Sequence, residues 1–302
     1  MARRVNPPRL NPLALDLTCP SVHTRMSPAN VPTAIIIFFV GHWVLAIFFQ
    51  TFFHHRYGAH KMFTMSKLWE RIFHLVTYMA QGASYLQPRA YAILHRMHHA
   101  YSDTEKDPHS PWQYKNVFTM MWATKKVYHA LAWDRFRPEP RFEGGYPVWH
   151  AIDKVFARGW IGPIGWGTGY VIFYLFFATA WWQFLLLPVH FLMGPIHGAI
   201  VNWFGHKWGY ENFDNGDKSK NTVPFDAITM GELFQNNHHK NSASPNFASK
   251  WFEVDPCYQV MRIFALLRII RWSNLRIEAP ALPAGATQVR RRNPESRAEE
   301  VA

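Results

Sequence analysis

Long apolar stretches restrict how this chain can fold more than any other feature of its sequence. The first covers residues 31–53 and contains no Asp, Glu, Lys or Arg. Its 23 residues exceed the roughly 20 that a helix needs to cross a bilayer. The second covers residues 161–201 and is long enough for a hairpin of two spans, with a turn near residues 181–183. The sequence therefore predicts several membrane-spanning helices.

The remaining segments are too polar to cross a membrane. A stretch at residues 72–94 is interrupted by polar side chains and by Arg89, which favours a partly buried or interfacial helix. Residues 100–160 and 202–256 belong in water, and apolar residues recur at helical spacing over residues 258–275. The mean hydropathy is −0.17 although 49% of the residues are hydrophobic, so the apolar residues must be clustered. We expect an all-α integral membrane protein with large parts exposed to water.

The composition narrows the possible partners. A net charge of +12 suits a cytoplasmic membrane face, anionic lipid or an acidic redox protein. Nucleic acid is not expected, because the basic residues are scattered or lie in the tail at residues 290–292. With two cysteines in all, a disulfide scaffold, a thiolate zinc site and an iron–sulfur cluster are excluded.

Three domains follow from the same pattern. Residues 1–30 are interrupted by prolines and predict an irregular arm without a cleavable signal peptide. Residues 31–275 form the membrane domain, and residues 276–302 form a disordered basic tail.

Histidines are grouped at the borders of the apolar stretches. The groups have ligand-like spacing: His55 and His60; His95, His98 and His99; Asn202 and His206; and Gln235, His238 and His239. The second and fourth groups have the spacing i, i+3, i+4 and share one face of a helix. His55 and His60 lie about 140° apart on an ideal helix, so the helix must bend or end near Gly58.

Metal binding explains these groups better than packing does. Neutral imidazole is a common metal ligand, and an unpaired one is costly to bury. Isolated histidines have a simpler interpretation as hydrogen-bonded core or interfacial residues, which we apply to His42, His54, His74, His129, His150, His190 and His197. Eight imidazoles exceed the capacity of one ion, so two metals are expected. Iron, copper and zinc all bind imidazole, and ligand type alone does not choose among them.

The full set of motifs resembles the membrane-bound fatty acid desaturases, in particular the stearoyl-CoA (Δ9) desaturase-like branch. The resemblance covers roughly residues 32–272 and includes Asp107-Pro108-His109, Gly231-Glu232 and Phe252-Glu-Val-Asp-Pro256. It implies a membrane anchor under a cytoplasmic helical cap that holds two non-haem iron ions. The iron ligands that it implies are His55, His60, His95, His98, His99, His206, His238 and His239, and no catalytic residue is expected apart from the metal centre.

Two further positions depart from, or add to, this ligand set. Asn202 matches an asparagine that reaches a metal through water in the family. Gln235 stands where the family usually has histidine, and we expect it to be a weak ligand or to hold a water, although a vacated position filled by water explains it nearly as well.

The implied reaction uses O2 and two external electrons to insert a cis double bond, at Δ9, into a fatty acyl chain. The chain has no electron-carrier segment of its own, so a separate ferredoxin, rubredoxin or cytochrome b5 with its reductase is expected, and a basic face could dock it. The acyl carrier stays open among CoA, acyl-carrier protein and phospholipid, because Ser110–Lys115 lacks the arginines of acyl-CoA members. The alternatives are a di-iron hydroxylase or monooxygenase and a non-catalytic metal or haem carrier.

The membrane topology follows from a single metal site. All histidine groups must lie on one side, the cytoplasmic one by resemblance, so residues 72–94 should not cross. Residues 31–53 then place the N-terminus on the far side, although the arginines in residues 1–30 favour the cytoplasm. Either the first segment is re-entrant or the positive-inside rule is violated.

Overall fold

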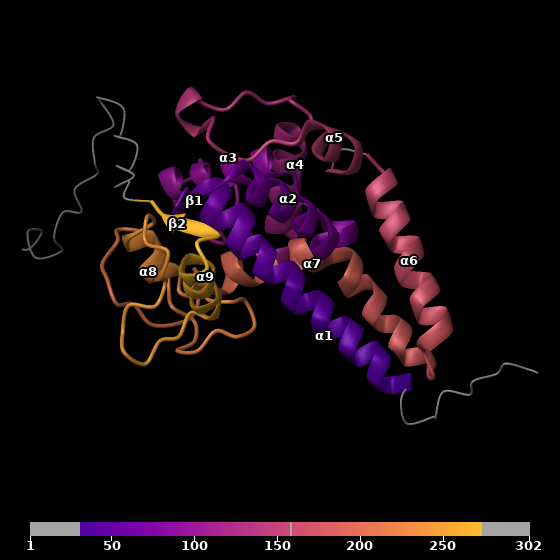
Figure 1. The fold of residues 1–302 in the computed structure, drawn as a ribbon. Coiled ribbons are helices and arrows are strands. Elements are labelled where there is room, and N and C mark those ends of the chain that lie inside the picture. The colour runs from indigo at the N-terminus through magenta and orange to yellow at the C-terminus, as the bar shows by residue number, and fades with distance from the viewer. Residues whose placement is uncertain (1–30, 158, 274–302) are drawn as a thin grey trace, which may run out of the picture.

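A computed structural model describes residues 31–157 and 159–273, and the expected N-terminal arm and basic tail lie outside this part. The regular structure is mostly helical with one two-stranded sheet, and long irregular segments connect some of the helices (Figure 1). Its elements are α1 (Val31–Phe49), η1 (Gln50–Ala59), β1 (Phe63–Met65), α2 (Lys67–Gln81), η2 (Gly82–Ser84), α3 (Pro88–Tyr101), α4 (Val117–Ala132), η3 (Pro140–Phe142), α5 (His150–Ile152), η4 (Asp153–Ala157), α6 (Ile161–Phe177), η5 (Trp181–Leu186), α7 (Leu187–Ala199), η6 (Ile200–Phe204), α8 (Gln235–Lys240), α9 (Pro256–Leu266) and β2 (Ile270–Trp272).

Helices of spanning length form one end of the molecule. Thr33–Ala59 and Trp181–Phe204 are each long and apolar enough to cross a membrane. The bent pair His150–Ala157 and Ile161–Phe177 counts as a third span if it is taken as one element. α1 packs against α6 and α7, and the three extend together away from the rest of the fold (Figure 1). The prediction of an all-α membrane protein is confirmed, with the hairpin turning at residues 178–180.

The polar segment between the first two histidine groups forms two helices, where the sequence suggested one over residues 72–94. α2 is capped by Ser66, whose hydroxyl accepts the Trp69 N–H. It ends at Gly82, which adopts φ +52°, a conformation that favours glycine. Pro88 then opens α3 at a position where its missing N–H is tolerated. α2 does not reach spanning length, and its outer face exposes Leu68, Leu75 and Met79 as expected of an interfacial helix.

The predicted helix over residues 258–275 is too long. α9 begins with the Asp255 cap and Pro256 but ends at Leu266, because Arg268 adopts φ +58°. Residues 270–272 then form β2, which pairs antiparallel with β1 and buries Ile270.

A phenylalanine-rich core joins α1 to the elements that follow it and to the C-terminal part of the described chain. It brings together buried residues from α1, η1, β1, α2 and the C-terminal segments. Phe52 contacts the rings of Phe63 and Phe73 with centroids 5.0 Å apart in both pairs. This core fixes η1, which contains His55 and is followed directly by His60.

Candidate metal centre

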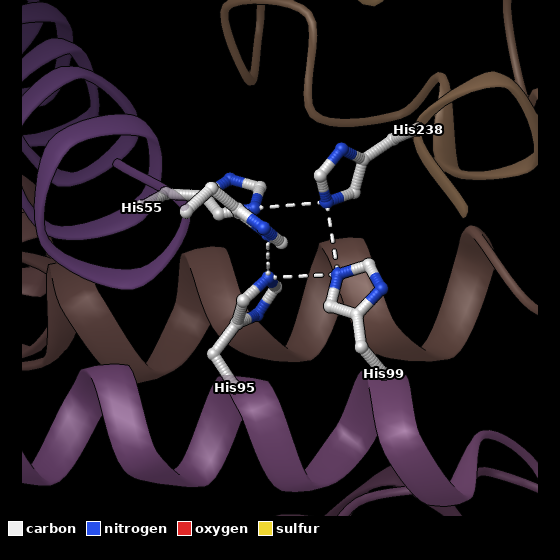
Figure 2. A group of neighbouring side chains, drawn as sticks. His55, His95, His99 and His238 are labelled. Atoms are coloured by element: carbon white, nitrogen blue, oxygen red, sulfur yellow. Dashed lines mark hydrogen bonds between the residues drawn. The ribbon is translucent and has the colours of Figure 1, made fainter. Parts of the chain in front are cut away.

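Five imidazoles from three distant segments converge on one point. They are His55 in η1, His60 directly after η1, His95 and His99 in α3, and His238 in α8. The Nε2 atoms of neighbouring rings lie 2.7–3.0 Å apart, and Figure 2 shows four of the rings facing one another. We call these five residues the first histidine group.

A local distortion of the helix brings His55 and His60 to the same side. η1 is a π-helix, and the His60 N–H donates to the His55 carbonyl at 3.1 Å. This i to i+5 bond widens the turn, so residues five apart come close to each other. The sequence predicted a bend or an end at Gly58, and the helix does end directly after it, at Ala59.

A second histidine group lies beside the first and consists of three imidazoles. Each Nδ1 of this group is hydrogen-bonded to a carboxylate. The pairs are His98 with Asp107 (2.9 Å), His206 with Asp103 (3.0 Å) and His239 with Asp217 (2.6 Å). The three Nε2 atoms are buried and have no hydrogen-bond partner among the described residues. Carboxylate partners on Nδ1 orient ligand histidines in many metal sites.

Metal binding would satisfy the imidazole nitrogens of both groups better than hydrogen bonds among the rings do. A neutral imidazole carries one N–H, so five converging Nε2 atoms cannot all be satisfied by hydrogen bonds. Separations near 3 Å match neighbouring ligands around one ion with metal–nitrogen bonds of about 2.1 Å. The second group presents three unpartnered nitrogens whose burial would be costly without an ion. The residues therefore provide two adjacent imidazole sites.

The family is decided by comparison with known proteins. The family model for fatty acid desaturases matches residues 29–262. The chain belongs to the fatty acid desaturase family. It is 27% identical over 252 residues to the sn-1 stearoyl-lipid 9-desaturase of Anabaena variabilis. The match covers 82% of this chain and 84% of that protein. The desaturase is thus an oxidoreductase of lipid metabolism that acts on fatty acyl chains.

Other relatives show similar coverage. The Delta-9 acyl-lipid desaturase 2 of Arabidopsis thaliana is 25% identical over 235 residues, with 74% of this chain and 72% of the relative covered. The hex-5-enoyl-[acyl-carrier protein] acetylenase of Moorena producens is 26% identical over 247 residues, with 72% and 70% covered. The family implies a metal site, and the two histidine groups of the desaturase are suited to one.

The electrostatic environment keeps the ligand nitrogens available. Burial, followed by neighbouring histidine charge, lowers the pKa of His95, His99 and His238 well below 6.5, so these rings are neutral at pH 7. Burial acts to raise the pKa of Glu232, but its 2.6 Å hydrogen bond with His55 and the nearby Arg56 guanidinium outweigh burial and lower this pKa to about 2. The carboxylate is therefore ionised and bonds to His55 Nδ1. This leaves the Nε2 atom of His55 free to bind a metal ion.

Each of the first two histidine motifs contains an arginine that fixes the backbone around the site. The Arg96 guanidinium donates to the carbonyls of Gly58, Ala59, Phe142 and Gly144 at 2.8–3.0 Å. It therefore ties α3 to the end of η1.

Arg56, the arginine of the first histidine motif, is fully buried. It donates to Asp255 at 2.7 Å and to Thr51 at 2.6 Å, and its guanidinium lies 3.9 Å over the Phe247 ring. This links η1 to the segment after α8.

Of the two additional positions from the sequence, Gln235 lies beside a neighbour of the second group, and the Asn202 side chain bonds to the helix that carries it. The Gln235 amide donates to the Glu232 carbonyl at 2.7 Å, and the side chain packs against Gly205, where a Cβ would lie 2.5 Å from Gln235 Cγ. Gln235 is therefore next to the residue that precedes His206. The Asn202 amide donates to the Gly198 carbonyl at 2.8 Å, which leaves its oxygen as an acceptor.

Several isolated histidines form hydrogen bonds away from the two groups, as their simpler interpretation predicted. His42 and His190 face each other at 2.7 Å, and His54 contacts the Gln81 amide oxygen at 2.9 Å. His74 lies 3.1 Å from Asp153.

Sequence reasoning did not assign any of the four carboxylates to a histidine Nδ1 atom, although Asp107 and Glu232 lie in motifs that carry the family resemblance. Asp103 and Asp107 follow the second histidine motif closely, and Glu232 precedes the last one, so their positions gave a signal. Asp217 has no such signal, because it lies in an irregular segment 22 residues from His239. Buried His109 was noted only as part of the Asp107-Pro108-His109 motif and given no role, and neither of its ring nitrogens has a hydrogen-bond partner in the described part.

Proposed function

We propose that the desaturase binds two iron ions and inserts a cis double bond at Δ9 of a fatty acyl chain. The first histidine group holds one ion and the second holds the other. The observation that carries the proposal is the pair of adjacent imidazole groups with unsatisfied buried nitrogens. Asn202 and Gln235 add a water-mediated or weak contact to the second ion.

The reaction balances as –CH2–CH2– + O2 + 2e⁻ + 2H⁺ → –CH=CH– + 2H2O. When bound, the metal ions supply the reduction of O2 that removes two hydrogens from adjacent carbons. The chain itself supplies neutral nitrogen donors, and carboxylates that keep the Nε2 atoms directed inward. Phe247, whose ring lies 4.3 Å from that of His238, helps to exclude water from the first group.

An acyl-lipid is the proposed substrate, with an acyl-carrier protein ester as the second candidate. Names of the Anabaena and Arabidopsis relatives refer to acyl-lipids and to position 9, whereas that of the Moorena relative refers to an acyl-carrier protein. Electrons come from a separate ferredoxin, rubredoxin or cytochrome b5 system, because no carrier segment is apparent in the sequence.

We further propose that both histidine groups face the cytoplasm and that residues 31–275 act as one membrane domain. Three crossings would place the N-terminus on the opposite side. Cysteine labelling tests this topology. Single cysteines are introduced at Asn30 and at Ser273, and intact cells are treated with a membrane-impermeant maleimide. Labelling is expected only at position 30.

Expression in a host with a defined lipid pool tests the reaction. Gas chromatography and mass spectrometry of dimethyl disulfide adducts should show a loss of two hydrogens at Δ9, first in intact glycerolipids. A gain of one oxygen would indicate a hydroxylase. Tight metal binding without O2 consumption, when reductant is supplied, would indicate a carrier. A His98→Ala variant, which lacks a ligand of the second ion, is the inactive control.

A further inference from the structure

One patch of surface is joined directly to the second histidine group. It is formed by Trp112, which is 46% exposed, together with Lys207 and Lys218. The Trp112 indole N–H donates to the carbonyl of His206 at 3.1 Å. A single hydrogen bond therefore connects an exposed aromatic ring to a residue of the second group.

The two lysines flank the same tryptophan. The Lys218 ammonium lies 4.0 Å from the Trp112 ring centroid, and the Lys207 ammonium lies 5.0 Å from it. Lys207 directly follows His206 in the chain. Lys218 directly follows Asp217, which holds His239, and its backbone N–H donates to Asp103 at 2.8 Å. Both positive charges are thus anchored to the framework of the second group.

These lysine charges are free to attract a partner. Neither ammonium forms an ion pair within residues 31–157 and 159–273, whereas Asp103 and Asp217 beside them are each paired with a histidine. Positive charge around an aromatic centre favours association with a negatively charged protein. Electron transfer falls steeply with distance and is helped by bonded paths, so a donor seated here is well placed for the second ion.

We propose that Trp112, Lys207 and Lys218 form the docking surface for an acidic electron-donor protein. The inference rests on the proposed function, because an enzyme that consumes external electrons needs such a surface. A second lysine pair provides a contrast: Lys125 and Lys126 lie over exposed Trp122 on α4 at 5.0 and 6.0 Å. No hydrogen bond in the described structure joins Trp122 to a histidine of either group.

Binding of a plant-type [2Fe–2S] ferredoxin to the iron-loaded full chain tests the proposal. The chain is placed in uncharged phosphatidylcholine nanodiscs, and Kd is measured by microscale thermophoresis at several salt concentrations. K207E/K218E should weaken binding at least about 10-fold at about 50 mM NaCl, and the difference should shrink at about 500 mM NaCl. The matched control K125E/K126E has the same change in charge and should alter Kd less than about 2-fold.

Iron content is measured for every variant, so that a disturbed metal site is recognised. If K207E/K218E loses iron, the milder K207Q/K218Q replaces it and should still weaken binding several-fold. Equal binding by wild type and the Lys207/Lys218 variant, or equal weakening in the control, would overturn the proposal. The proposal would also be overturned if the Lys207/Lys218 variant lost affinity for an acyl-carrier protein but still bound ferredoxin. The surface would then serve the substrate carrier.

A separate measurement distinguishes failure of this proposal from failure of the proposed function. Wild-type enzyme is supplied with dithionite and an acyl-lipid, and double-bond formation is measured without any donor protein. No product in this assay would refute the desaturation proposal whatever the ferredoxin result. Product formation combined with unchanged ferredoxin binding in K207E/K218E would refute the docking surface alone.

Discussion

Replacing Asp107 by asparagine should remove one metal ion and leave the other. The Asp107 carboxylate is buried and accepts hydrogen bonds from three donors. His98 Nδ1 lies 3.0 and 2.9 Å from its two oxygens and shares one N–H between them, and the Asp103 N–H (2.9 Å) and the His109 N–H (3.0 Å) each donate to one oxygen. The backbone donors contact different oxygens. Either orientation of an asparagine amide therefore places its NH2 against a backbone N–H.

The expected magnitude follows from these contacts. Losing a hydrogen bond to a charged group costs about 1.5–3 kcal/mol. Loss of such a partner behind a ligand histidine typically lowers metal affinity about 10–100-fold, or about 1.4–2.7 kcal/mol. The two free-energy ranges overlap, and the contact between the asparagine NH2 and a backbone N–H favours their upper end. We therefore expect the affinity for the second ion to fall about 100-fold. Asp107 contacts no histidine of the first group, so the first ion should stay.

Iron titration followed by mass-spectrometric metal analysis provides the assay. At an iron concentration that just saturates wild type, D107N should retain about one ion per chain. D153N is the matched control, because Asp153 is also buried and bonded to a histidine, His74, outside both groups. It should retain both ions. Two ions in D107N, or equal iron loss in D107N and D153N, would show that the carboxylate does not act through its histidine.

Three other substitutions have definite expected outcomes. Arg96→Lys loses the planar fork that binds four carbonyls, so thermal unfolding should show a loss of about 2 kcal/mol, and unchanged stability would contradict the clamp. Gln235→His adds the family's usual ligand, and it should keep activity and bind the second iron at least as tightly; complete metal loss would refute a site that tolerates this ligand. Burial raises the pKa of Cys257 to about 12, so in a Cys19→Ser background maleimide at pH 8 should label the thiol only after unfolding, as judged by mass spectrometry.

The membrane anchor could be predicted from the sequence because hydropathy is a local property. Residues 31–53 overlap the span Thr33–Ala59 over all but their first two positions, and the second arm of the hairpin became the span Trp181–Phe204. The end of α9 could not be predicted in this way. Apolar residues continue at helical spacing past Leu266, but pairing of β2 with β1, which is distant in sequence, takes up Ile270. Long-range pairing of this kind leaves no periodic signal.

The histidine motifs were predicted from the sequence, but their division between two groups was not. Spacing placed His95, His98 and His99 on one helical face, whereas the fold directs His95 and His99 to the first group and His98 to the second. Around an ideal helix His95 and His99 are about 40° apart, whereas His98 lies on the other side of His95, about 60° from it and about 100° from His99. That offset lets one helix supply both groups.

The distribution of carboxylates makes the two groups chemically unequal. In the second group every Nδ1 has an acidic partner, so the protein fixes each ring and its tautomer before any metal binds. In the first group only His55 has such a partner among the described side chains. Its other rings are brought together by η1 and His60 directly after it, by α3 and by α8. The second site is therefore organised by side chains and the first by backbone geometry, so substitutions of carboxylates and distortions of η1 should act on different ions.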